Sequence, residues 1–262
     1  MRIGFFQFQP IFGDKKANLQ KITQTLSQIK ADLIVLPELC NTGYSFKNCK
    51  ELFGLSEKIP DGETSQTLLT LAQKKNLFII AGLAEKEKSQ VYNSAILVTP
   101  DQKAYTYRKA HLFFEEKFIF NRGNTKFRTY QCNKIKIGII ICFDYIFPEA
   151  SRTLALAGAQ IICHPSNLIL PYAQKMTITR AIENRVFFIM ANRIGTEKRT
   201  GKYLKFNGRS QIISPTGDIL AKAGSNQEAI KIVDINPDQA LDKYVTKYNN
   251  VWSDRRTDLY YK

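Results

Sequence analysis

Short apolar runs alternate with amphipathic stretches along the whole chain. Runs such as 33–36 and 139–141 are apolar on successive residues, which is typical of strands buried on both faces. The strands predicted in this way are 3–8, 32–36, 77–82, 94–98, 135–142, 160–163, 186–191, 211–213 and 229–233.

Between these runs, apolar residues recur at the spacing of a helix. Leu19, Ile22, Leu26 and Ile29 lie three or four residues apart and form one face of an amphipathic helix. Further helices are predicted at 64–75, at 172–185, and from Pro148, which suits a first helical turn, to Gly158, which can end one.

The alternation of strands and helices predicts a single α/β domain, 1–262, whose sheets are covered by helices. The order strand, helix, strand recurs near the midpoint, with 32–38 and 137–142 in comparable places. This recurrence predicts two similar halves that pack sheet to sheet.

The composition is that of a globular protein. Hydrophobic residues make up 44% of the 262, which excludes disorder as the dominant state. No run approaches the roughly 18 apolar residues of a membrane span, and Gln7 interrupts the stretch where a signal peptide would stay apolar. Five cysteines without a CxxC pair favour reduced thiols, so we expect a cytoplasmic protein with no membrane partner.

The pattern offers little support for metal or nucleic-acid chemistry. His111 and His164 are too far apart for a helical pair, and no spacing completes a zinc site, so neither a metal nor another cofactor is expected. The net charge is +15, and the densest basic group lies at 198–209. It can meet phosphates or an acidic partner, but no nucleic-acid motif accompanies it. A solvated loop is therefore favoured, and no nucleic-acid partner is expected.

Three segments place reactive side chains after strands, where α/β folds collect such groups. In the first, Glu38 follows Pro37 directly after four aliphatic residues. One interpretation is an ordinary surface or helix-capping carboxylate. The other is a site residue, because a glutamate held against apolar walls has a raised pKa that suits general acid–base work.

The second segment, 105–113, contains Lys109. It is either a solvated basic edge strand or the place where Lys109 presents a compact charge at a mouth lined by Tyr107, Phe113 and Phe114. His111 is interpreted as a hydrogen-bonded structural residue.

The third segment ends at Cys142, between the predicted strand 135–142 and a helix begun by Pro148. A bend of this kind exposes a nucleophile and offers backbone N–H groups. The other four cysteines are interpreted as buried packing residues. A thiol of pKa about 8.5 needs a neighbouring base or cation, and Glu and Lys are the available activators.

Together these segments resemble the nitrilase, or carbon–nitrogen hydrolase, superfamily, which uses a Glu-Lys-Cys triad. The resemblance extends over nearly the whole chain, as far as Asp254-Arg255-Arg256, and implies a four-layer α-β-β-α sandwich and an enzyme. Its motifs are Leu36-Pro37-Glu38 with Thr42-Gly43-Tyr44, Arg108-Lys109-Ala110-His111-Leu112, and 138–144 followed by Phe147-Pro148-Glu149.

The resemblance implies a role for each residue of the triad. Glu38 takes the Cys142 proton, and the thiolate attacks an amide or nitrile carbon. Lys109 and the N–H of Phe143 then stabilise the developing charge. Glu38 protonates the leaving amine or ammonia, and water hydrolyses the thioester.

The family also has a second glutamate after the lysine. Glu116 matches it, and the spacing to Phe118 and Gly123 favours Glu116 over the adjacent Glu115. Its implied role is to orient Lys109 or the substrate.

The substrate is less narrowly defined than the reaction. Tyr44, Phe114 and Phe143 are expected to form aromatic pocket walls, and Asn167 lies in a segment that resembles the family's pocket wall. A small linear amide or N-carbamoyl compound is favoured, and an aliphatic nitrile is the alternative. A basic nucleic-acid-binding protein and a catalytically silent scaffold remain as other classes.

The resemblance further implies a homodimer or a higher even oligomer. Family members pair through helices next to the nucleophile strand, here the helix after Pro148 and the one at 172–185. Trp252 and the Tyr260-Tyr261 end are expected to reach toward the partner.

Overall fold

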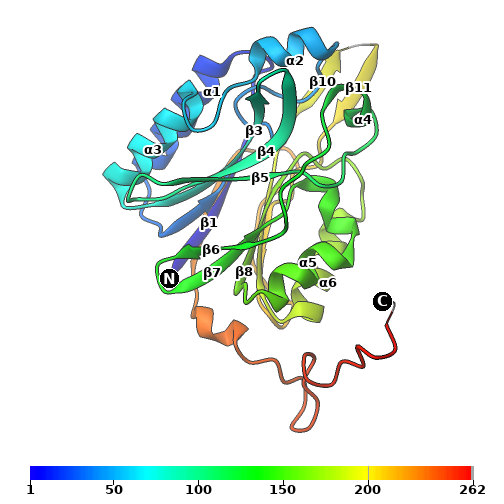
Figure 1. The fold of residues 1–262 in the computed structure, drawn as a ribbon. Helices are drawn as coiled ribbons and strands as arrows, with labels where there is room; N and C mark the ends of the chain where they lie inside the picture. The colour runs from blue at the N-terminus through cyan, green and yellow to red at the C-terminus, as the bar shows by residue number, and fades with distance from the viewer. Residues whose placement is uncertain (200, 261–262) are drawn as a thin grey trace.

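The computed structural model describes residues 1–199 and 201–260, and its strands form two six-stranded sheets and a separate hairpin (Figure 1). The first sheet contains, in spatial order, β14 (Ala229–Asp234), β1 (Arg2–Gln7), β2 (Leu33–Val35), β3 (Phe78–Glu87), β4 (Gln90–Val98) and β5 (Ala104–Arg108). The second contains β13 (Ile219–Lys222), β12 (Gln211–Ile213), β9 (Phe187–Asn192), β8 (Ile161–Ser166), β7 (Ile135–Ile139) and β6 (Thr129–Cys132). The hairpin consists of β10 (Thr196–Arg199) and β11 (Lys202–Lys205).

Helices cover the outer face of each sheet. The first sheet carries α1 (Lys15–Ser27) and α3 (Glu63–Lys75), and the second carries α5 (Pro148–Leu156) and α6 (Ala173–Asn184), so the layers run α-β-β-α as the sequence predicts (Figure 1). The remaining helical segments are α2 (Cys49–Leu55), α4 (Glu116–Ile119) and the 3₁₀ turns η1 (Cys142–Ile146) and η2 (Pro237–Ala240).

The apolar runs are buried on both faces because each sheet lies between two apolar layers. Along β2, Leu33 and Val35 point into the core between the sheets, whereas Ile34 points into the core under α1 and α3. Ile22 on α1 packs in that outer core, and the helix starts where Asp14 accepts a hydrogen bond from the Ala17 N–H at 2.9 Å.

The two halves are similar, but their correspondence differs from the prediction. Each sheet has three parallel strands in its middle, β1-β2-β3 and β7-β8-β9, with antiparallel strands outside them. By this pattern β7 corresponds to β1 and β8 to β2. The prediction that 32–38 and 137–142 occupy comparable places is therefore wrong by one strand, because 32–38 contains the second parallel strand of its half, β2, whereas 137–142 begins in the first parallel strand of the other half, β7.

The hairpin β10–β11 corrects the interpretation of 198–209 as a solvated loop. Its ladder pairs Glu197 with Leu204 and Lys198 with Tyr203. Figure 1 shows the hairpin beside α2 and α4, which belong to the first half of the chain. An insertion between β9 and β12 thus reaches across to loops of the other sheet.

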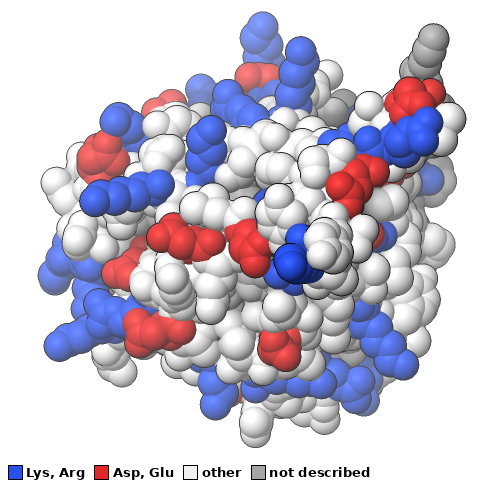
Figure 2. Space-filling model, turned by 90° about the horizontal axis from the view of Figure 1, so that it is seen from below, with Lys and Arg blue, Asp and Glu red and all other residues white. Residues whose placement is uncertain are grey.

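No helix of the described residues is both long enough and apolar enough to cross a membrane. On the face that Figure 2 shows, Lys and Arg are interspersed with Asp, Glu and uncharged residues.

Candidate active site

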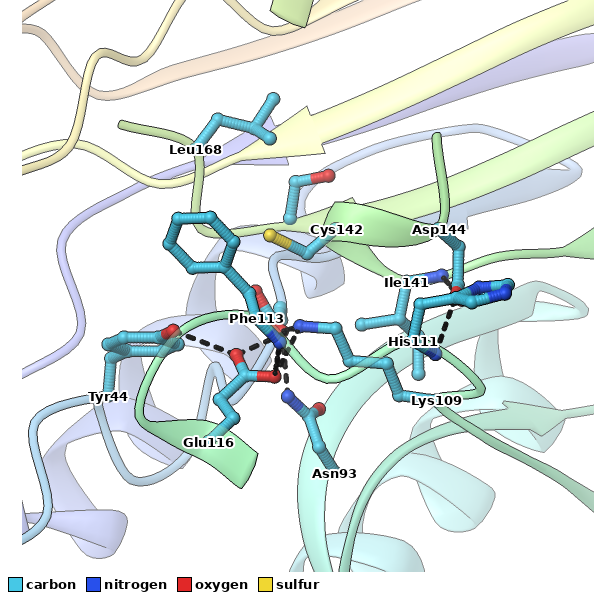
Figure 3. Close-up of polar contacts among 12 residues, drawn as sticks. Tyr44, Asn93, Lys109, His111, Phe113, Glu116, Ile141, Cys142, Asp144 and Leu168 are labelled. Atoms are coloured by element: carbon cyan, nitrogen blue, oxygen red, sulfur yellow. Dashed lines mark hydrogen bonds and ion pairs between the residues drawn. The ribbon is translucent and has the colours of Figure 1, made fainter. Parts of the chain in front are cut away.

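Glu38, Lys109 and Cys142 follow β2, β5 and β7, and the fold brings them to one buried cluster, in which Figure 3 labels Lys109 and Cys142. The ammonium of Lys109 lies 2.7 Å from Oε1 of Glu38, with both side chains fully buried. Figure 3 shows the Cys142 sulfur and the Lys109 ammonium pointing into the same space. Residues 71 positions apart in sequence therefore form the ion pair next to the thiol.

Local packing fixes the backbone at Glu38. Pro37 has no N–H and so ends the ladder of β2. Gly82 on β3 lies against Glu38, since a Cβ atom at position 82 would be 2.4 Å from the Cα of Glu38. The Gly82 N–H donates to the Pro37 carbonyl at 3.1 Å, and the Cys40 N–H donates to the Gly82 carbonyl at 2.9 Å. These contacts hold Glu38 against β3.

Asn93 on β4 positions both charged groups. Its side-chain NH₂ group donates to Oε1 of Glu38 at 2.7 Å, and its main-chain carbonyl accepts a hydrogen bond from the backbone N–H of Lys109 at 2.8 Å. Oε1 therefore has two donors, whereas Oε2 of Glu38 is buried without a hydrogen-bond partner.

Glu116 is the second carboxylate at Lys109. The ammonium donates to its Oε1 at 2.9 Å, and Tyr44 donates its hydroxyl hydrogen to the same oxygen at 2.8 Å. The Phe113 N–H donates to Oε2 at 3.0 Å. The adjacent Glu115 lies at the surface, where it pairs with Lys202.

Cys142 lies in η1, beyond the end of β7 at Ile139, so the predicted strand 135–142 extends three residues too far. Its φ is +42°, a left-handed conformation that no strand can hold. Asp144 stabilises this bend, because its Oδ2 accepts the Ile141 N–H at 2.9 Å and the Tyr107 hydroxyl at 2.7 Å. The bend turns the thiol out of the sheet.

Burial and charge decide the protonation of the cluster. Burial alone would lower the pKa of Lys109, but the carboxylates of Glu116 and Glu38 outweigh it and hold that pKa well above its usual value. Burial raises the pKa of Glu116, although Lys109 opposes the shift. Burial, reinforced by Glu38, raises the pKa of the Cys142 thiol well above its usual range. Burial and the neighbouring carboxylate therefore favour the neutral form of the Cys142 thiol.

The histidines are placed as structural residues. His111 Nδ1 lies 2.7 Å from Oδ1 of Asp144, and the His111 ring stacks on Phe147. His164 is fully buried, and its Nε2–H donates to the Cys142 carbonyl at 2.8 Å. Its Nδ1 has no partner, so protonation there would bury an unpaired charge.

His164 predicts acid sensitivity of the fold. Burial lowers the pKa of His164 from 6.5 to about 4. Between these two values the imidazole is therefore protonated in the unfolded chain and neutral in the native protein. At 1.36 kcal/mol per pKa unit, stability should fall by up to about 3 kcal/mol as the pH drops from 6.5 to 4. Urea unfolding at pH 7 and pH 4.5 should show a smaller acid loss for His164→Gln. An equal loss in both proteins would exclude His164 as the cause.

Two neighbouring cavities lie at the site. A small hollow beside Cys142 shares the walls Phe113 and Asn167 with a cavity of about 260 Å³, and Phe143 lines the hollow. Phe114 lines the larger cavity, and most of its side chain is exposed to solvent. Both side-chain polar atoms of Asn167 are buried without a partner.

Several residues of this arrangement have no counterpart in the sequence analysis. Asn93 lies in β4, one residue before the start of the strand predicted at 94–98, and an asparagine within a strand, where this residue type is uncommon, is the available signal. Arg193 is fully buried and pairs with Glu197, which also accepts the N–H groups of Tyr44 and Ser45. The contacts of Glu197 with Tyr44 and Ser45 join residues far apart in sequence, and no local pattern indicates them.

Among the described residues, no group of three or more His, Cys, Asp or Glu side chains is placed to hold a metal ion. The site instead combines a thiol, an ammonium and two carboxylates in an apolar surrounding, which suits acyl transfer through a covalent intermediate.

Residues 2–242 match the family model described as carbon-nitrogen hydrolase, and the chain belongs to this family. It is an enzyme that hydrolyses carbon–nitrogen bonds. A nitrilase of Pyrococcus abyssi is 38% identical over all of both chains, and an N-carbamoylputrescine amidase of Solanum lycopersicum is 30% identical over 93% of this chain and 87% of its own. The crystal structure of a carbon-nitrogen hydrolase from Helicobacter pylori G27 covers 99% of this chain and 97% of its own, with a TM-score of 0.86 and 27% identity.

Proposed function

We propose that the protein hydrolyses a small linear amide or N-carbamoyl compound through a thioester on Cys142. The observation that carries this proposal is the asymmetric environment of Glu38. Lys109 and Asn93 occupy its Oε1, which leaves Oε2 as the oxygen able to accept a proton. A neutral thiol requires such a base at the moment of attack.

In the first half of the reaction, Cys142 attacks the carbonyl carbon while its proton passes to Oε2 of Glu38. Negative charge develops on the substrate oxygen, and the Lys109 ammonium and the Phe143 N–H stabilise it. That N–H lies in the first turn of η1, where backbone N–H groups have no partner within the helix. The carbon–nitrogen bond then breaks, and Glu38 gives its proton to the leaving ammonia or amine.

In the second half, Glu38 takes a proton from water, which attacks the thioester and releases the acid and the thiol. Glu116 does not exchange protons in this scheme. It orients Lys109, and Tyr44 and the Phe113 N–H fix its own position. Asn167, with an unpartnered donor and acceptor, is suited to bind an amide or carbamoyl group of the substrate.

Mass spectrometry tests the covalent step directly. After mixing with an aliphatic amide at low pH to slow hydrolysis, the acyl group should appear on the peptide that contains Cys142. Cys49 is an exposed thiol, and its peptide should carry none. Ammonia release without any adduct on Cys142, under conditions that trap thioesters, would contradict the scheme.

Nitrile hydrolysis is the second candidate, because a relative of 38% identity is named a nitrilase. The same thiol would then form a thioimidate, which water converts to the acid and ammonia. Comparing ammonia release from matched amides and nitriles decides between the two reactions.

The homodimer and the cytoplasmic location stay predictions. Leu156 on α5 and Ile182 on α6 are exposed apolar residues that suit an interface between subunits. Tyr261 lies outside the described residues.

A further inference from the structure

Three cavities at the site share walls in turn, from the hollow at the sulfur to a cavity with a charged rim. Phe113 and Asn167 line both the hollow at Cys142 and the 260 Å³ cavity. Phe114 and Leu204 line both that cavity and a further one of about 250 Å³. The shared walls place neighbouring cavities next to one another, so an elongated substrate that occupied all three would extend from the thiol to the outermost one.

The middle of this series is apolar. Its walls are Tyr44, Phe113, Phe114, Ile169 and Leu204, and Asn167 is the polar exception at the inner end. A chain of methylene groups is the complement of such walls, since its burial is favourable and needs no hydrogen-bond partner.

The outermost cavity has a different chemistry. Lys202 and Lys47 line it, and they face a single available carboxylate, that of Glu115. Glu116 also borders the cavity, but its oxygens already hold Lys109, Tyr44 and the Phe113 N–H. Among the residues that line this cavity, two lysines therefore stand against one carboxylate that is not already bound to Lys109.

We propose that the substrate carries a carboxylate at the end remote from the scissile bond, and that Lys202 binds it. This assignment rests on the proposed function and narrows it to linear amides or carbamoyl compounds of ω-carboxylic acids. Lys202 would exchange its partner Glu115 for the substrate, and the half-exposed Glu115 would return to water. A surface ion pair of this kind costs at most about 1 kcal/mol to break.

An ammonium end fits the rim less well. To bind Glu115 it would have to displace Lys202 and then lie next to both Lys202 and Lys47. Like charges at such distances repel, so the balance of the rim favours an anion. An uncharged end would leave the existing Lys202–Glu115 pair in place and gain nothing from it.

Lys202 sits on a hairpin that is tied to the site. Arg199 donates to Glu51 on α2 at 2.5 Å and to the Ser45 carbonyl at 3.1 Å. Glu197 accepts the Ser45 N–H at 2.6 Å. The hairpin is thus anchored to the loop that carries Tyr44, which holds Lys202 at the rim rather than free in solvent.

The test uses amides of equal chain length that end in a carboxylate, a neutral carboxamide or an ammonium. In the wild type, kcat/KM should be highest for the carboxylate. In Lys202→Met the carboxylate-to-carboxamide ratio should fall about tenfold, the loss expected for one charge-assisted hydrogen bond. Glu115→Gln frees Lys202 and should raise the same ratio.

Lys198→Met is the matched control, because Lys198 lies on the same hairpin but lines none of these cavities. It should leave the ratio at the wild-type value. A ratio near one in the wild type, or an equal fall in the Lys198 and Lys202 variants, would overturn the assignment.

Binding separates this inference from the proposed function. Calorimetric titration of the Cys142→Ala protein with the same compounds reports recognition without turnover. Tighter binding of the carboxylate, lost in Cys142→Ala/Lys202→Met, would support the assignment even if no member of the series were hydrolysed. Turnover of all three ends with equal binding would leave the hydrolase proposal standing and reject the role of Lys202.

Discussion

Replacing Cys142 with alanine is expected to abolish turnover, by a factor of at least about 10⁴ in kcat. The thiol is the single group in the cluster that can form the covalent bond, and neither Lys109 nor Glu38 can substitute for it while they are paired with each other. The substitution removes one buried atom, so the free energy of unfolding should change by only about 1 kcal/mol.

Cys132→Ala is the matched control for that experiment. Cys132 is fully buried on β6, and burial raises the pKa of its thiol as it does for Cys142. Its removal should cost similar stability and leave kcat within about twofold. If Cys142→Ala kept wild-type kcat for an established substrate, the covalent scheme would be wrong.

Replacing Glu38 with glutamine should lower kcat/KM by about 10³, within the range for loss of a general base. The glutamine oxygen would take the place of Oε1, where Lys109 and Asn93 both donate. Its NH₂ group would then occupy the place of Oε2 and present a donor, so it could not accept the proton of Cys142. The expected fall is therefore in kcat, with KM nearly unchanged.

The control for Glu38→Gln is Glu85→Gln. Glu85 is a buried carboxylate on β3, and it pairs with Arg108 at 2.5 Å. Loss of that charge should reduce the urea midpoint, whereas kcat measured on the folded protein should stay near the wild-type value. A Glu38→Gln protein with more than a tenth of wild-type kcat would exclude Glu38 as the base.

Much of the fold follows from local patterns. Continuous apolar runs predict the strands at the centre of each sheet because both of their faces are buried, and Pro148 marks the start of α5 within one residue. The apolar runs do not predict β5, β6, β10, β11 and β13, which are short or partly exposed and so lack a continuous apolar run. Their pairing depends on neighbouring strands rather than on their own composition.

The site divides in the same way. Glu38, Lys109 and Cys142 stand out because each follows a strand and carries unusual chemistry for that position. Asn93 and Glu197 act through long-range hydrogen bonds, to residues 55 and 152–153 positions away, and those distances close only in the folded chain. The end of β7 was misplaced because its apolar run continues to Ile141, whereas the side chain of Asp144 turns the backbone earlier.

Glu38, the proposed base, follows a strand of one sheet and Cys142 follows a strand of the other, and the apolar layer between the sheets acts as a spacer. Its thickness is set by side chains such as Val35 and Ile161, which never meet the substrate. Removing a methyl group from that layer would let the two sheets move together by fractions of an ångström. Such a shift should change the rate of proton transfer more than it changes the free energy of unfolding. We therefore expect directed evolution of this enzyme to select substitutions that raise kcat in the layer between the sheets, remote from the walls of the cavities.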